Sequence, residues 1–137
     1  MYFTTFQKRT TSDTDILDIT QDVEAAIVAS HLSDGLVTIG VAGSTASITT
    51  IEFESGVVND LRAAIERIAP SEMHYDHDAR WGDGNGYSHV RSALLGPSVS
   101  IPLQQGRLVL GTWQQLVLCD FDNRGRSRSV YVQILGG

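Results

Sequence analysis

The chain has 137 residues, of which 42% are hydrophobic and 19% charged, and its formal net charge is −6. These values predict one globular domain over residues 1–137, long enough to bury a core, and they exclude a disordered chain. The acidic balance disfavours an extended nucleic-acid partner, and no apolar run approaches the ~20 residues of a membrane span, so we expect neither nucleic acid nor membrane as a partner.

The first half of the chain mixes strands with helices. Abundant aromatic and threonine residues predict a strand at 2–9, and a second short strand is expected at 14–19. A helix near 21–33 would begin after a Thr20 cap and end at Gly35. Strands at 35–41 and 45–53 follow. A second helix, capped by Ser55 and ended by Pro70, carries an apolar stripe at helical spacing from Val57 to Ile68.

The second half begins with a polar loop of about a dozen residues that leads into a short helix at 87–95. Strands are expected at 98–103, 107–110, 113–121 and 128–135, and the turn-rich segment Asp122–Gly125 predicts that the last two form a hairpin. The order indicates an α+β domain: a mostly antiparallel sheet with two main helices and a short third helix.

The glycine-rich end of the polar loop is a candidate anion site. Gly84, Asn85 and Gly86 directly precede the third helix, and Asn85 is a plausible cap. Glycines let a backbone approach a ligand, and unpaired N–H groups at a helix start attract phosphate. The alternative is an ordinary flexible turn, and the local sequence does not separate the two.

Three acid–base side chains lie in the same segment. His77, His89 and Asp83 are candidate catalytic residues, because neutral imidazole can move a proton or bind a metal. His77 and His89 are also candidate metal ligands, with carboxylates suiting Mg²⁺ and imidazole suiting Zn²⁺. Two histidines twelve positions apart match no tight metal motif, so a purely structural role stays open.

Other polar groups are candidates for substrate binding. Ser44, Thr45 and Ser47 form a hydroxyl-rich turn, and Arg126 lies in an arginine-rich segment that could grip phosphate. Glu52 is a further candidate, although a polar strand face is the commoner explanation for Glu52 and a solvated hairpin tip for Arg126. The single cysteine, Cys119, lies in an apolar run and is expected to be buried and inert in a reducing cytoplasm.

Longer motifs resemble the YjbQ family, also called the secondary thiamine-phosphate synthase family. They are "SVSIPLQQGRLVLGTWQQLVL" at 98–118, "STASITTIEFESGVVNDL" at 44–61, "YDHD" at 75–78 and "DGNGYSHVRSALLG" at 83–96. The resemblance covers nearly the whole chain in the same order. It implies a small α+β fold, a homotrimer, and a polar pocket that includes His77 and His89.

The resemblance also implies a transferase. Some members of the family are credited with weak thiamine-phosphate synthase activity, which joins a pyrimidine pyrophosphate to a thiazole phosphate. Many members carry a histidine at the head of the hydroxyl-rich turn, where this chain has Gly43. We therefore expect a small phosphate-handling protein in which this activity is weak or absent. A non-catalytic binding module for a small phosphorylated metabolite or a metal ion is the alternative.

Overall fold

The computed structural model describes all residues from 1 to 137. The chain forms eight strands and four helices. Their order and bounds are β1 (Tyr2–Arg9), β2 (Asp15–Asp18), α1 (Thr20–Ser30), β3 (Gly35–Val41), β4 (Ala46–Glu52), α2 (Ser55–Ile68), α3 (Asp76–Trp81), α4 (Gly86–Leu95), β5 (Ser98–Gln104), β6 (Arg107–Leu108), β7 (Gln114–Asp120) and β8 (Ser127–Gly136). None of the helices is long and apolar enough to cross a membrane.

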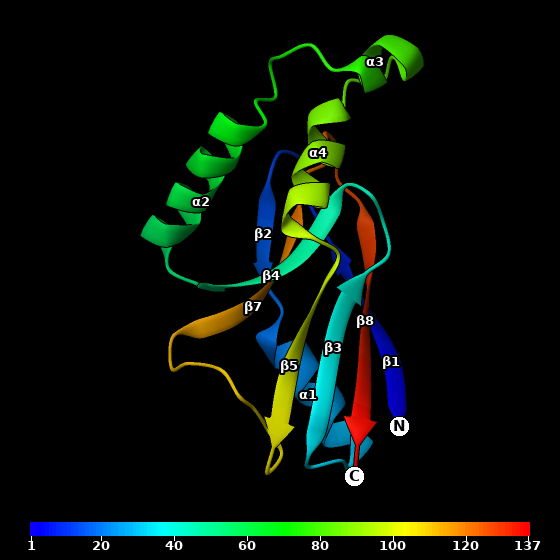
Figure 1. Cartoon of the computed structure of the whole chain (residues 1–137), viewed down its shortest axis with the longest axis vertical. Helices are drawn as coiled ribbons and strands as arrows, with labels where there is room; N and C mark the ends of the chain where they lie inside the picture. The colour runs from blue at the N-terminus through cyan, green and yellow to red at the C-terminus, as the bar shows by residue number, and fades with distance from the viewer.

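The strands form two antiparallel sheets, as the predicted α+β class requires. The larger sheet has the order β1-β8-β3-β5-β6, and the smaller has the order β2-β7-β4. In Figure 1 the long strands β3, β5 and β8 run side by side and α1 lies behind them. The helices α2, α3 and α4 lie toward the end of the sheet that is far from the two chain termini. The layers therefore leave one face of the larger sheet without a helix.

The core lies between the two sheets and α1. Alternation along β8 and β3 directs apolar side chains to one face, and these are buried against Ile48 of β4, Leu116 and Leu118 of β7, and the apolar face of α1. A smaller cluster, including Phe121 and Cys119, lies against α2. Burial raises the pKa of the Cys119 thiol to about 12, which fits the inert cysteine that the sequence predicts.

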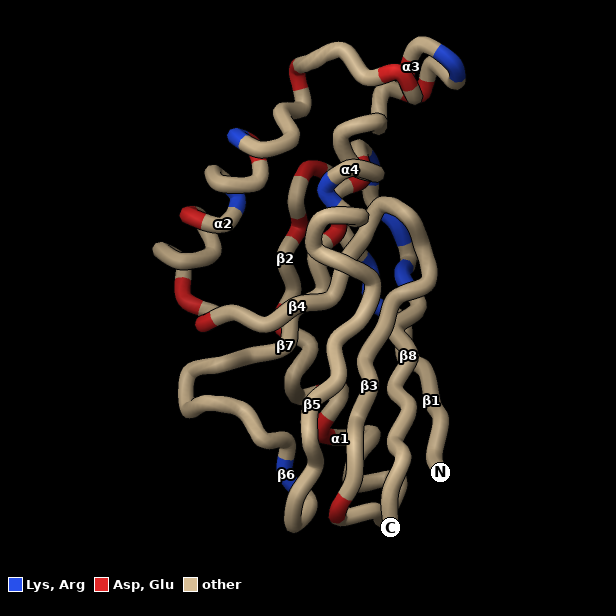
Figure 2. The backbone as a smooth tube through the Cα atoms, viewed as in Figure 1, with Lys and Arg blue, Asp and Glu red and all other residues tan.

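The other face of the larger sheet is free of charge along its middle. Figure 2 shows β3 and β5 without a single acidic or basic residue. Phe3 stacks on Tyr131 with ring centroids 5.9 Å apart, and the hydroxyls of Thr38 and Ser100 are hydrogen-bonded at 2.8 Å across β3 and β5. A chain with 19% charged residues thus presents a broad neutral surface of apolar and hydroxyl side chains.

Several sequence predictions about local structure are wrong. The expected hairpin at 113–135 does not form, because β7 pairs with β2 and β4 in one sheet while β8 pairs with β1 and β3 in the other. The polar loop contains the six-residue helix α3. The cap positions are also shifted: Glu54, not Ser55, accepts the first amides of α2.

The ends of α1 differ from the prediction as well. Ile19 occupies the cap position, and the Thr20 hydroxyl instead bonds Asp18 and accepts the amide of Leu116, which ties the helix start to β7. His31, rather than Gly35, takes the left-handed conformation that ends the helix. Trp113, directly before β7, is 73% exposed.

Candidate functional site

A polar pocket of about 540 Å³ lies where α3, α4, the turn before β4 and the segment before β8 meet. Only one of its lining residues, Trp81, is hydrophobic. The lining is Gly43, Ser44, Thr45, His77, Trp81, Asp83, Asn85, His89, Asp122, Arg126 and Arg128. Four separate segments of the chain therefore contribute side chains to one cavity.

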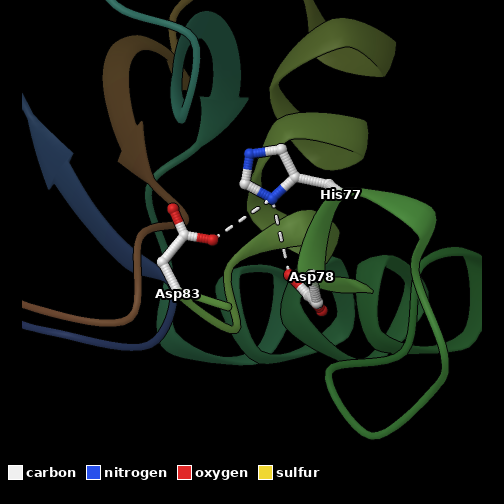
Figure 3. Close-up of side chains that lie close together, drawn as sticks. All are labelled: His77, Asp78 and Asp83. Atoms are coloured by element: carbon white, nitrogen blue, oxygen red, sulfur yellow. Dashed lines mark hydrogen bonds and ion pairs between the residues drawn. The ribbon is translucent and has the colours of Figure 1, made fainter. Parts of the chain in front are cut away.

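Two helices bring the histidines together. His77 is the second residue of α3 and His89 lies in the first turn of α4, and their ring centroids are 4.5 Å apart. Asp83, in the link between the helices, lies with its carboxylate 3.3 Å from His77 Nδ1, and Asp78 is 3.5 Å from the same nitrogen. Figure 3 shows both carboxylates directed at this edge of the ring.

The spacing of these atoms fits a shared divalent ion. Two ligands bound tetrahedrally at ~2.1 Å lie about 3.4 Å from each other, close to the separations of His77 Nδ1 from the two carboxylates. One ligand atom each from His77, Asp78 and Asp83 can be chosen so that all three lie within 4.8 Å of one another. An imidazole nitrogen suits Zn²⁺, and carboxylate oxygens suit Mg²⁺.

A buried ion-pair network forms the floor of the pocket. The carboxylates of Asp120 and Asp122 have no exposed surface. Arg128 donates from Nε and Nη2 to Asp120 and also from Nη2 to the Thr45 hydroxyl. Arg126 donates from Nε to Asp122, at 2.9 Å. Neither Nη1 takes part in these hydrogen bonds.

The charge of Asp122 is maintained by its partners. Burial favours the neutral carboxyl, but hydrogen bonds from Asn85, Asn123 and Arg126 outweigh burial and lower its pKa below the ordinary value. An ionised Asp122 accepts hydrogen bonds only. The groups that touch it must therefore turn their donors toward it.

The glycine-rich segment is arranged differently from a phosphate cradle. The amide of Gly86 is already bonded to Asp78 Oδ1 at 2.8 Å. A Cβ at Gly86 would lie 2.5 Å from Tyr75 Cβ, so the glycine is required for the close approach of α3 to α4. Gly84 does not line the pocket, and Asn85 does so through a side chain bonded to Asp122.

The other predicted substrate-binding residues divide into two groups. Ser44, Thr45 and Arg126 line the pocket with the histidines. Ser47 is fully buried elsewhere, where its hydroxyl donates to the carbonyl of Ser92, and Glu52 is exposed at the end of β4. The structure does not bring these last two residues to the pocket.

The predicted site residues did not include three that line the pocket, Trp81, Asp122 and Arg128, or Asp78, which contacts His77 without lining the pocket. Asp78 and Arg128 stood in segments that already drew attention, but nothing distinguished them from their neighbours. Asp122 was read only as a turn residue. Its buried partners lie 37 and 77 positions away, beyond the range of any local pattern.

Comparison with known proteins places the chain among uncharacterised relatives. Residues 4–137 match the family model described as "UPF0047 protein YjbQ-like". A UPF0047 protein of Archaeoglobus fulgidus is 35% identical over 93% of this chain and 96% of its own, and the UPF0047 protein YugU of Bacillus subtilis is 33% identical over 96% and 98%.

Solved structures lead to the same family. A YbjQ-like protein of unknown function from Sulfolobus solfataricus has a TM-score of 0.93 at 32% identity, covering 99% of this chain and 97% of that one. A hypothetical protein from Aeropyrum pernix also has a TM-score of 0.93, at 28% identity, and both chains are covered completely. The family model, the relatives and the fold coincide over nearly the full length, and the chain belongs to the YjbQ-like UPF0047 family.

Proposed function

We propose that the pocket binds a small phosphorylated molecule together with a divalent cation. The observation that carries this proposal is that one cavity contains both ligands for a cation and donors for an anion. His77, His89 and Asp83 offer ligands for a cation, while Arg126 and Arg128 offer donors for an anion. A phosphate group satisfies both halves at once, because its oxygens bind metal ions and accept from guanidinium groups.

A bound cation would supply charge stabilisation at the phosphate oxygens. The residues of the chain would do the rest: Arg126 and Arg128 orient the anion, and an imidazole of the pair that is not needed as a ligand can hold or deliver a proton. This arrangement supports a transferase that releases a phosphorylated leaving group. The same contacts without turnover would make the protein a binding module.

We expect thiamine-phosphate synthase activity to be weak or absent. Gly43 lies in the pocket wall, at the position where the family resemblance implies a histidine in many members, and a Cβ there would meet Arg128 Nη1 at 3.0 Å. Arg128 is held by Asp120 and Thr45, so it has little room to yield. Gly43 thus keeps Arg128 Nη1 free for an anion in place of the missing imidazole.

A homotrimer is part of the same proposal. The neutral outer face of the larger sheet supports self-association, because copies of a chain with net charge −6 can meet there without bringing like charges together. Phe3, Leu36 and Leu135 each expose more than two fifths of their surface on this face. Such side chains are typical of a surface that a partner covers.

Calorimetric titration with pyrophosphate, with and without Mg²⁺ or Zn²⁺, tests the proposed function. We expect binding that requires the cation and weakens about tenfold or more in His77→Ala and His89→Ala, the scale of one lost polar contact. His74→Ala is the matched control, because His74 is exposed outside the pocket. Equal binding by all three variants and the wild type would refute the proposal.

A thiamine-phosphate synthase assay with both phosphorylated precursors decides the finer point. We expect turnover far below the ~1 s⁻¹ of a dedicated enzyme. Turnover at that rate in the unmodified chain would show that the imidazole replaced by Gly43 is dispensable.

A further inference from the structure

Asn85 carries the one buried side-chain polar atom of the protein that has no hydrogen-bond partner. The residue is only 7% exposed, it lines the pocket, and its Oδ1 accepts nothing. Leaving a buried acceptor unpaired opposes folding. Asn85 lines the pocket, so an occupant that reaches this shielded oxygen would supply the missing donor.

The orientation of this amide is imposed by one carboxylate. Asp122 Oδ1 accepts from Asn85 Nδ2 at 3.2 Å and from the amide of Asn123 at 2.8 Å. Since Asp122 is ionised, Asn85 must turn its NH₂ group toward it and its carbonyl away. The unpaired Oδ1 is therefore a consequence of Asp122.

The same carboxylate holds two more pocket residues through its other oxygen. Asp122 Oδ2 accepts from the Thr45 hydroxyl at 3.1 Å and from Arg126 Nε at 2.9 Å. Asp122 itself is fully buried. It thus fixes three recognition groups from beneath the pocket wall.

We infer that Asp122 is a positioning residue that presents the Asn85 carbonyl as a hydrogen-bond acceptor, so that the pocket selects an anion bearing a proton. The inference rests on the proposed function and narrows its ligand to hydrogen-bearing anions, such as a protonated phosphate group. A site built around an acceptor discriminates against an analogue that lacks the matching donor. Because Oδ1 is shielded from water, the wall must adjust slightly as a ligand enters.

Asp122→Asn reverses this arrangement. Two donors, Thr45 and Arg126, hold an oxygen at the Oδ2 position, against the single amide of Asn123 at Oδ1, so the new NH₂ group takes the Oδ1 position and faces Asn85. The Asn85 amide must then turn its carbonyl to that NH₂ and its own NH₂ the other way. The pocket exchanges an acceptor for a donor while its shape is conserved.

Phosphate and sulfate are the probes, because they have similar size and only phosphate carries a proton at neutral pH. We expect the wild type, with the divalent ion present, to bind phosphate about tenfold more tightly than sulfate, the effect of one hydrogen bond. In Asp122→Asn this ratio should fall to about one or below. A ratio that Asp122→Asn leaves unchanged overturns the inference.

Asp120→Asn is the matched control. Asp120 is equally buried and paired with Arg128, but it touches neither Asn85 nor Arg126. We expect this variant to change the affinity for both anions by the same factor and to preserve their ratio. If Asp120→Asn also lost the preference for phosphate over sulfate, that preference would depend on the ion-pair network as a whole and not on Asp122. This result would also overturn the inference.

The NMR signals of the Asn85 side-chain amide decide the matter if neither anion binds. That result would defeat the proposed function, yet the amide orientation can still be measured in the protein alone. Contacts of the Asn85 NH₂ protons that change in Asp122→Asn, but not in Asp120→Asn, support the positioning role. Identical contacts in the wild type and Asp122→Asn overturn it.

Discussion

Replacing Gly86 by alanine separates two roles for the glycine-rich segment. The added Cβ would lie 2.5 Å from Tyr75 Cβ, 3.0 Å from Tyr75 Cγ and 3.1 Å from Asp78 Oδ1. Overpacking of this kind costs ~1–3 kcal/mol. Alanine recovers ~0.5–1 kcal/mol because it is a better helix former than glycine. We expect the free energy of unfolding in urea to fall by about 0.5–2 kcal/mol, with α3 displaced from α4.

Gly111→Ala is the control, because a Cβ there meets only Gln114 at ordinary contact distances of 3.7 and 3.8 Å. Its free energy of unfolding should stay within ~0.5 kcal/mol of the wild type. Cation binding should weaken in Gly86→Ala alone, because α3 carries His77. Full stability combined with loss of phosphate binding would refute this reasoning and would make Gly86 a backbone cradle.

Three further predictions follow from burial and charge. Cys119 should resist alkylation at pH 8 in the folded protein and react only after unfolding, because burial raises its pKa to about 12; mass spectrometry with and without urea checks this. The lowered pKa of Asp122 means that its contribution to stability is present above its ordinary value of 3.8 and is lost as pH falls through the lower folded value; the stability difference between the wild type and Asp122→Asn should shrink in acid melts. Light scattering after size exclusion should give a trimer mass for the wild type and a monomer for Tyr131→Glu, which places charge on the neutral sheet face; a monomeric wild type would contradict the proposed assembly.

The sequence predicted most elements whose apolar residues recur at a clear period. The alternation along β8 and the apolar stripe of α2 were sufficient to predict these two elements, because one face of each is buried in apolar surroundings. The helix α4 was predicted without an apolar stripe, with Asn85 as its plausible cap. Its buried face is polar: Ser88 donates to the carbonyl of Phe121, and Arg91 to that of Ala69.

The candidate site was predictable in part. The chemistry of His77, His89 and Asp83 was visible because rare residue types cluster within a short stretch. The sequence did not reveal that β7 and β8 belong to different sheets, because a turn sequence does not determine which strands pair with the strands on either side of it. The floor of the pocket depends on that pairing, since Asp122 and Arg128 lie where the chain crosses from one sheet to the other.

A crystal structure of the protein grown with Mn²⁺ and pyrophosphate tests the central claim most directly. Mn²⁺ scatters anomalously and stands in for Mg²⁺. We predict an anomalous peak within ~2.3 Å of ligand atoms of His77 and Asp83, with a phosphate oxygen between the ion and the Nη1 atoms of Arg126 and Arg128. A pocket that stays empty at saturating concentrations, or an ion bound only outside it, would contradict the account.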